Sequence, residues 1–275
     1  MGMQIATNVS ALNANRNLGI NQNNVSKSLE KLSSGLRINR AADDAAGLAI
    51  SEGLKAQISG TNVAARNAQD GISVIQTAEG ALSEIHAILG RVRDLTVQAG
   101  NDSNNTESRA AIKTEIEALG EELTRVAEAT NFNGIKLLNG DNATLTFQVG
   151  AGAVAAEDQI AVTLTDFSAL GTTIAGLDVS DATNVLTSID AIDDEIENVS
   201  TARAELGAAQ NRFESTINSL NVASENLSAA NSRIRDTDMA SEMVKYTASN
   251  ILLQAGQAML AQANQSTQGI LQLLR

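Results

Sequence analysis

The stretch that decides the fold is residues 185–234, which read VLTSIDAIDDEIENVSTARAELGAAQNRFESTINSLNVASENLSAANSRI. Alternate steps of four and three residues from Val185 to Ile234 reach 15 positions, of which 11 are apolar. This average repeat of 3.5 residues is the pattern of a coiled-coil seam. A helix of about 50 residues is roughly 75 Å long, so the stretch predicts an elongated, mainly α-helical protein.

Four positions of this seam are polar: Arg203, Gln210, Ser224 and Asn231. Two interpretations stay open for them. A buried polar residue fixes the register of a coiled coil, and a polar residue at the edge of the seam has no such role.

Two helices with the same rhythm are expected upstream. The first begins near Asp43 or Asp44, after a non-helical connector at residues 35–44, and runs towards Gly100; the second follows Asn104 or Thr106. Their apolar positions are Ile75, Ala78, Leu82, Ile85, Leu89, Val92 and Thr96, and then Ile112, Ile116, Leu119, Leu123 and Val126.

Strands are expected only between these helices and the long one. Leu145, Phe147 and Val149 alternate with polar residues, and so do Ile160, Val162 and Leu164. This alternation predicts one small β-hairpin at about residues 144–165 with a long loop. Residues 131–134 and 138–140 are interpreted as turns.

The two ends of the chain share an unusual composition. Both carry apolar side chains at helical spacing among Asn, Gln, Ala and Ser, and residues 239–275 contain only three charged residues, Glu242, Lys245 and Arg275. Helices with so few charges approach one another without desolvating charged groups. We therefore expect the ends to pack against each other and against other copies of the chain, and to be partly disordered before they do so.

Charge separates the middle of the chain from its ends. Residues 99–200 hold 18 acidic and 4 basic residues, a balance of −14, whereas the rest of the chain holds 14 acidic and 15 basic residues. Because like charges repel, the middle is expected to face solvent in any assembly that the ends build. The chain has no basic stripe with interleaved aromatic residues, so nucleic-acid binding is not expected. No apolar run is long enough to enter a membrane.

No catalytic, cofactor or metal site is expected. The chain has one histidine, His86, and no cysteine, so a His- or Cys-rich zinc site is excluded. The acidic clusters at residues 43–44 and 193–195 are interpreted as helix starts and solvated faces. The first residues lack the charged and apolar regions of a cleaved secretory signal.

Seven segments in order resemble bacterial flagellins, and the resemblance covers nearly the whole chain. They are residues 5–12, IATNVSAL; 32–39, LSSGLRIN; 41–50, AADDAAGLAI; 91–95, RVRDL; 130–134, TNFNG; 206–213, LGAAQNRF; and 260–265, LAQANQ. The resemblance implies an extracellular structural protein, the self-polymerising subunit of the flagellar filament used for swimming. The fold that it implies is an antiparallel helical coiled-coil rod with a discontinuous N- and C-terminal helical core.

The resemblance also implies a division of the chain. Residues 1–43 and 236–275 would form the inner core of the filament, and residues 44–235 the surrounding helical rod domain with the hairpin. About 40 residues separate the first strand from the long helix, so the large outer domains of many flagellins are not expected. The residues expected to pack between subunits are Ile5, Val9, Leu12, Leu29, Leu32, Ile251, Leu252, Met259, Leu260, Leu271 and Leu274.

Further partners follow from the family. The resemblance implies unfolded export through the flagellar type III apparatus, a chaperone that holds the C-terminal helix, and contacts with filament cap and hook-associated proteins. The segment that a vertebrate Toll-like receptor recognises in flagellins corresponds here to Arg91, Leu95, Gln98 and Glu115.

Two alternatives remain open from the sequence. A hook–filament junction protein has similar ends but would not polymerise alone into long filaments. A secreted coiled-coil effector or membrane-inserting translocator would need a long apolar hairpin. Seeded polymerisation viewed by electron microscopy distinguishes the three.

Overall fold

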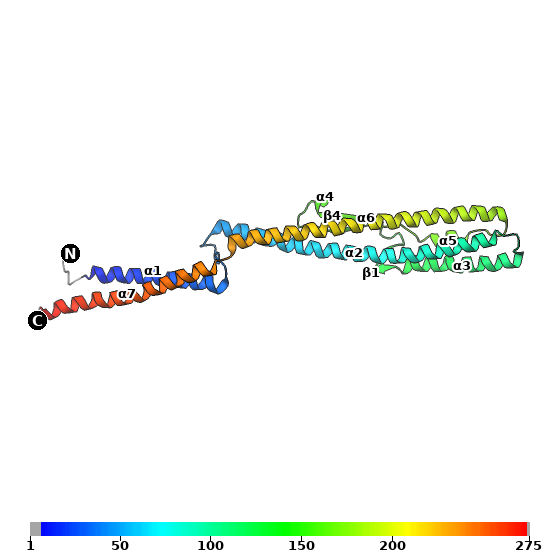
Figure 1. Cartoon of the computed structure of the whole chain (residues 1–275). Helices are drawn as coiled ribbons and strands as arrows, with labels where there is room; N and C mark the ends of the chain where they lie inside the picture. Colours follow the sequence, from blue (N-terminus) through cyan, green and yellow to red (C-terminus); the bar gives the residue numbers. More distant parts are fainter. Residues whose placement is uncertain (1–6, 274–275) are drawn as a thin grey trace. The chain divides into compact units, whose positions relative to one another are not determined.

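The computed structural model describes the backbone of residues 7–273 and the side chains of that range except residue 182 and residues 267–273. Two compact units are present. The terminal unit combines the described residues up to Ala56 with those from Asn226 onwards, and the central unit is Gln57–Glu225. Two long helices, α2 (Ala45–Ala99) and α6 (Ala182–Arg235), belong to both units (Figure 1).

The central unit is built on α2, α3 (Thr106–Ala129) and α6, which run alongside one another in Figure 1. Arg91 of α2 pairs with Glu115 of α3, and Arg93 of α2 pairs with Asp193 of α6. Near the other end of the unit, Ser224 Oγ of α6 donates to Asn62 Oδ1 of α2 at 3.0 Å. These contacts make α6 antiparallel to α2 and confirm the mainly α fold with antiparallel long helices.

The predicted seam of α6 is confirmed along its whole length, because none of its 15 side chains is exposed. Five of them, seven residues apart, are fully buried: Val185, Ile192, Val199, Leu206 and Phe213. They join one hydrophobic cluster with the buried face of α2, where all seven predicted seam positions from Ile75 to Thr96 are also buried. The fully buried positions of the seam thus run from Val185 to Phe213, and those from Ile217 to Ile234 are half-buried.

The polar seam residues use their side chains differently. Ser224 bonds to α2, and Arg203 lies 3.6 Å from Glu79 of that helix. Gln210 instead donates to Glu214 on the exposed side of α6 itself. A role in register is thus supported by contacts at Arg203 and Ser224, whereas Gln210 fits the interpretation of an edge residue.

The β-hairpin lies where the alternation predicts it. Strands β3 (Thr144–Gln148) and β4 (Gln159–Thr163) pair antiparallel, with Thr144 opposite Thr163 and Gln148 opposite Gln159. The hairpin packs on the helices through Phe147, whose ring meets that of Phe213 edge-on at 5.5 Å between centroids. In the connecting loop, a four-residue helix, α4 (Ala155–Asp158), presents the Asp158 carboxylate to the backbone N–H groups of Gly152 and Val154.

A second, smaller strand pair surrounds one predicted turn. Strands β1 (Asn131–Phe132) and β2 (Ile135–Lys136) are only two residues long each. Asn133 and Gly134 between them have φ of 48° and 83°, the left-handed conformation that Asn-Gly favours in a tight hairpin. The turn was evident from sequence, but strands this short leave no alternation to detect.

A short helix that the sequence pattern does not predict, α5 (Leu170–Ala175), packs on α3. The two approach so closely that a Cβ on Gly171 would lie 2.2 Å from the Gly120 carbonyl oxygen and 2.0 Å from Thr124 Oγ1. Lys113 of α3 then donates to the carbonyl oxygens of Ala175 and Leu177 at 2.5 and 2.6 Å. Since α5 has only six residues, these tertiary contacts rather than its own propensity hold it in place.

Gly171→Ala is therefore expected to destabilise the central unit, by about 1–3 kcal/mol, because the added methyl group overpacks the α3–α5 contact. The matched control is Gly207→Ala in α6, where nothing lies within 4 Å of the added Cβ and the helix is expected to gain about 0.5–1 kcal/mol. Urea unfolding followed by circular dichroism measures both. Equal effects in the two variants would contradict the close approach.

Candidate subunit interface

The terminal unit consists mainly of two antiparallel helices, α1 (Val9–Ser34) and α7 (Met239–Leu273). At one end of the pair Asn8 Nδ2 donates to the carbonyl oxygen of Ala263 at 3.0 Å. Near the other end Ser28 Oγ donates to Glu242 Oε1 at 2.7 Å. Asn8 also caps α1 by accepting from the Ala11 N–H, a role in which asparagine is favoured.

The connector expected at residues 35–44 is present and ties the two ends of the chain together. Gly35 ends α1 with φ of 73°, a left-handed conformation that glycine adopts at low cost. The Arg37 N–H then donates to the Arg235 carbonyl, and the Thr237 N–H donates to the Gly35 carbonyl. Arg235 itself forms an ion pair with Glu52 at 2.6 Å.

The adjacent aspartates of the connector have separate roles. Asp44 Oδ1 accepts from the Gly47 N–H and caps the first turn of α2. Asp43 Oδ2 accepts from the N–H groups of Arg40 and Asn39, and these backbone hydrogen bonds lower the pKa of Asp43. Both aspartates thus have specific backbone hydrogen bonds at the start of α2, which agrees with their interpretation as a helix start.

The seam between α1 and α7 is thin. At steps of three and four residues, the inward residues of α1 and its N-cap are Asn8, Ala11, Ala14, Leu18, Asn21, Val25, Ser28 and Leu32, and those of α7 are Glu242, Tyr246, Ser249, Leu253, Gly256, Leu260 and Ala263. Most are small or polar. Within the described part of the terminal unit, Ile38 is the one fully buried hydrophobic residue, whereas the central unit has a large dry cluster.

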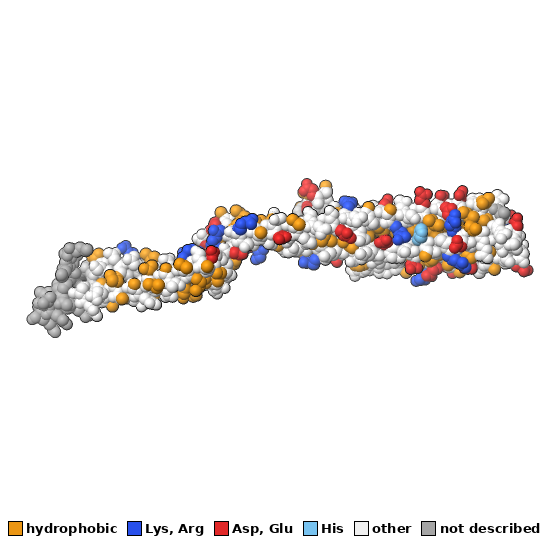
Figure 2. Space-filling model, in the orientation of Figure 1, with side chains coloured by type: hydrophobic (Ala, Val, Ile, Leu, Met, Phe, Trp, Pro, Cys, Tyr) orange, Lys and Arg blue, Asp and Glu red, His pale blue; other side chains and the backbone are white. Residues whose placement is uncertain are grey.

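Large apolar side chains of the terminal unit lie instead on its surface. Of the 17 exposed large hydrophobic residues of the described chain, 11 belong to this unit. Figure 2 shows hydrophobic side chains along the part that α1 and α7 occupy, with few charged ones among them. Exposed apolar side chains gathered in this way on one part of a protein mark an interaction site.

The residues predicted to pack between subunits divide into three groups. Leu32 and Leu260 are half-buried in the seam between α1 and α7. The exposed group consists of Val9, Leu12, Leu29, Ile251, Leu252 and Met259. Ile5 and Leu274 lie outside the described residues, as does the side chain of Leu271.

On α7 the exposed residues form a stripe that faces away from α1. The outer stripe of α7 is defined here as the set of exposed side chains of Val244, Ala248, Ile251, Leu252, Ala255 and Met259. Helical spacing places Val244 and Ile251 opposite the inward residues, and Leu252 and Met259 on the flank of the same exposed surface. An open groove of about 390 Å³ lies on the same face, lined by Met243, Val244, Thr247, Ala248 and Ile251. The packing residues predicted from sequence include Ile251, Leu252 and Met259 of this stripe but not Val244, Ala248 and Ala255, which share their helical spacing.

One buried carboxylate links the two helices. Glu242 is 6% exposed and accepts hydrogen bonds from Ser28 Oγ across the seam and from Lys245 Nζ on its own helix. The Ser28 hydrogen bond is the main cause that lowers the pKa of Glu242 below its ordinary value; Lys245 and the charge of Lys31 add to it. A lowered pKa means that the ionised form stabilises the helix pair.

In the filament that the resemblance implies, Glu242→Gln is expected to reduce stability at neutral pH by about 1–3 kcal/mol per subunit, since an ionised acceptor forms the stronger hydrogen bond. The stabilising charge is fully present above the ordinary pKa of 4.5 and is lost as pH falls through the lowered value. The difference in disassembly temperature between wild type and variant should therefore shrink from pH 7 to pH 3, as followed by light scattering. A difference independent of pH would contradict the assignment.

The residues matched to receptor recognition lie on the central unit. Arg91 donates to Glu115 Oε1 through Nε and Nη2, at 3.1 and 2.7 Å, and both side chains remain half exposed. Gln98 is exposed as well. Leu95 is only 2% exposed and belongs to the hydrophobic core, so the structure brings Arg91 and Glu115 together but gives Leu95 no outward side chain.

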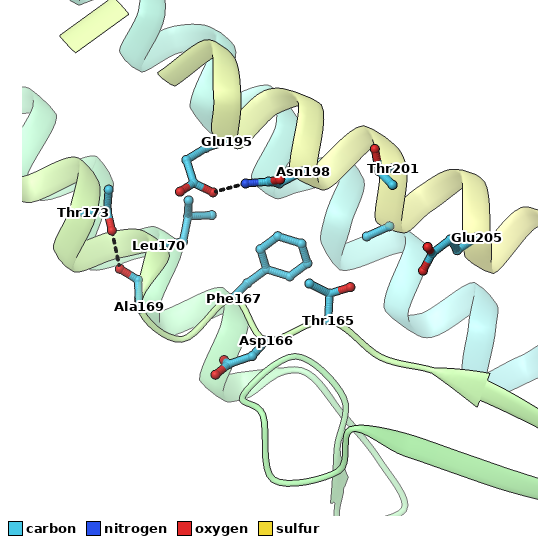
Figure 3. Close-up of a pocket in the computed structure, with 11 residues that line it drawn as sticks. Thr165, Asp166, Phe167, Ala169, Leu170, Thr173, Glu195, Asn198, Thr201 and Glu205 are labelled. Carbon is cyan, nitrogen blue, oxygen red and sulfur yellow. Dashed lines mark hydrogen bonds between the residues drawn. The ribbon is translucent and has the colours of Figure 1, made fainter. Parts of the chain in front are cut away.

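A polar groove of about 430 Å³ lies between α6 and residues 165–173 (Figure 3). Two of its three carboxylates have structural partners: Glu195 accepts from Asn198 Nδ2, and Asp166 Oδ1 accepts from the Ser168 N–H. Within the described residues, no cluster of three or more His, Cys, Asp or Glu is placed to hold a metal ion. Among the helices described, none is long and apolar enough to cross a bilayer.

Comparison with known families gives two matches that together cover most of the chain. Residues 5–143 match the bacterial flagellin N-terminal helical region, and residues 189–274 match the bacterial flagellin C-terminal helical region.

Similar proteins agree over the full length. The chain is 55% identical over 273 residues to a flagellin of Halalkalibacterium halodurans, with 99% of this chain and 100% of the relative covered. It is 50% identical to a flagellin of Bacillus subtilis at the same coverage. A solved structure of a putative flagellar hook-associated protein from Vibrio parahaemolyticus is similar with a TM-score of 0.59 over 70% of this chain and 100% of that one. Because the two sequences are only 16% identical, this structural similarity supports the fold alone.

Proposed function

This chain belongs to the bacterial flagellin family and is a structural subunit of the extracellular flagellar filament, and we propose that its terminal unit builds the inner core of that filament. The core would consist of residues 1–43 and 236–275, with residues 44–235 around it. The unit found in the structure extends somewhat further, to Ala56 and from Asn226, because the ends of α2 and α6 join it.

The observation that carries this proposal is the outer stripe of α7. It is exposed in the single chain, and residues 246–274 contain no charged side chain. Exposure of these apolar groups to water is unfavourable, and burial against the same helices of neighbouring copies removes that cost. A contact of this kind that does not close into a ring propagates as a helical filament.

The remaining predicted packing residues extend this surface to α1. Val9 and Leu12 lie on the face of α1 that points away from the α7 seam, and both are more than half exposed. We assign them, with Leu29, to contacts with neighbouring copies. Leu32 and Leu260 instead support those contacts from within the helix pair.

Ile251→Asp tests the proposal. Ile251 is 61% exposed and lines the open groove on α7, so a charge there should leave the central unit folded but stop growth on filament seeds, since a buried unpaired carboxylate is costly. The matched control, Leu186→Asp, places the same charge on an exposed leucine of α6 in the central unit and should still grow. Electron microscopy and seeded light scattering provide the measurement; growth of Ile251→Asp at the wild-type rate would refute the proposal.

Export and assembly partners belong to the same proposal. An uncharged apolar stripe that is exposed before assembly is prone to non-specific association. This supports a dedicated chaperone that binds α7 during type III export. It also supports a cap protein at the growing tip, and we expect contacts with hook-associated proteins. Size-exclusion chromatography of the subunit with the export chaperone should give a complex that is lost when residues 239–275 are removed. A complex that survives this removal would place the chaperone elsewhere.

We also assign receptor recognition to the pair Arg91 and Glu115 with Gln98, while Leu95 acts by packing α2 from inside. In a reporter assay with the vertebrate Toll-like receptor, the purified subunit should give a response that Arg91→Ala weakens. No response to the purified subunit would reject this assignment. No catalytic function is proposed, and the chain is not expected to bind nucleic acid or insert into membranes.

A further inference from the structure

The methionines of this chain are confined to its two ends. The sequence has five, at positions 1, 3, 239, 243 and 259, and residues 4–238 contain none. The three that the structure describes all lie on α7, and their side chains are 47%, 51% and 65% exposed in chain order. An exposed thioether is open to oxidants in solution.

Two of these methionines lie within the surface that we assign to subunit packing. Met259 is part of the outer stripe of α7, one helical turn from Ala255 and two from Leu252. Met243 lines the open groove beside Val244 and Ile251. Met239 lies one turn before Met243, at the start of α7. An unbranched thioether adapts well to an apolar interface, but a sulfoxide in the same place is polar.

We propose that the methionines of α7 make filament growth sensitive to hydroperoxides, because the free subunit exposes them and the assembled subunit does not. The reaction transfers the terminal oxygen of the hydroperoxide to the sulfur. The O–O bond breaks and an S–O bond forms, so that the thioether is oxidised by two electrons and the hydroperoxide is reduced to water or an alcohol. The resulting oxygen must then be buried without a partner when the subunit joins the filament.

The inference rests on the proposed packing of α7, and it adds a step that selects unoxidised subunits for assembly. A subunit oxidised before assembly is excluded from the filament, whereas a subunit already in the filament is protected. Methionine sulfoxide is reduced enzymatically, so the exclusion is reversible. Met1 and Met3 lie outside the described residues and are not part of the inference.

The first test compares oxidation in the two states of the wild-type protein. Free subunits and filaments are exposed to the same hydrogen peroxide concentration, and sulfoxide is measured by peptide mass spectrometry. Met243 and Met259 are expected to oxidise at least about ten times faster in the free subunit, in proportion to their loss of exposure. Equal rates in the two states would overturn the inference.

The second test measures growth on seeds. Peroxide-treated wild-type subunits should elongate at least about tenfold more slowly than untreated ones, which corresponds to about 1.4 kcal/mol, and methionine sulfoxide reductase should restore the rate. Treated subunits that carry sulfoxide at both Met243 and Met259 and still grow normally would overturn the inference while leaving the proposed function intact. Untreated wild type that fails to grow on any seed would instead refute the proposed function.

A triple variant identifies the sulfurs responsible. M239L/M243L/M259L keeps similar side-chain volumes and retains Met1 and Met3. Its ratio of treated to untreated growth rate should stay near one, whatever its untreated rate. A ratio as low as that of wild type would place the sensitivity outside α7. If the variant does not elongate, the reductase experiment on wild type decides, since failure of the reductase to restore growth also contradicts the inference.

Discussion

A chain that ends at Asp238 is expected to form no filaments, although its central unit should melt as it does in the full-length protein. Removal of residues 239–275 takes away all of α7, including the outer stripe and the seam partner of α1. Left alone, α1 is a 26-residue helix with many Asn residues, which is marginal in water without a partner. The hydrophobic cluster of the central unit extends from Ala68 to Phe213 and contains no residue of α7.

The truncated chain is compared with the full-length chain in two measurements. Electron microscopy after seeding reports polymerisation, and thermal circular dichroism reports the central unit. The expected pair of results is an absence of filaments with an unchanged main melting transition. If the truncated chain formed filaments, α7 would not be needed for assembly. If its main melting transition were lost, α7 would be required for the fold of the central unit.

Phe213→Ala is expected to have the largest effect of any single core substitution. Phe213 is fully buried and joins three elements: its own helix α6, the hairpin through Phe147, and α2, where a Cβ on Gly71 would lie 2.9 Å from the ring. The chain has only four phenylalanines and no tryptophan, and Phe213 is the most deeply buried of these rings, at 0% exposed against 3% for Phe167. The expected loss is about 3–5 kcal/mol of unfolding free energy.

Thermal unfolding of the subunit measures this loss. For a unit of this size, it corresponds to a drop in melting temperature of roughly 10 °C. Leu186→Ala is the control, because Leu186 is an exposed apolar residue of the same helix and should change stability by less than about 0.5 kcal/mol. A comparable effect of the two substitutions would contradict the central position of Phe213.

Sequence could predict the long helices because their periodicity persists over many turns. Each position of the α6 seam from Val185 to Ile234 is buried or half-buried as expected, and the hairpin has the predicted position. The third helix shows the limit of this method. The predicted Ile112, Ile116 and Leu123 are buried, and Leu119 and Val126 are half-buried, but the buried face also includes Gly120 and Ala127, which the apolar pattern did not indicate. Close packing of α5 requires the glycine at position 120.

Features held by tertiary contacts were not predictable from local pattern. Helix α5 depends on Gly120 and Lys113, which lie about 50 residues or more away in sequence. The hydrogen bond between Ser28 and Glu242 joins residues 214 positions apart, and neither residue is apolar enough to suggest burial. For α1 and α7, the composition indicated packing surfaces, but it did not separate the side chains of the shared seam from the outer stripe.

Amide hydrogen exchange, resolved by peptide, tests most directly how the two units differ between the isolated subunit and the filament. The central unit, with its large buried core, is expected to be protected in both states. Helices α1 and α7, whose seam contains few large apolar residues, are expected to exchange rapidly in the isolated subunit and to become protected in the filament. Strong protection of both helices in an isolated subunit that refuses to grow on seeds would contradict the claim that neighbouring copies stabilise them.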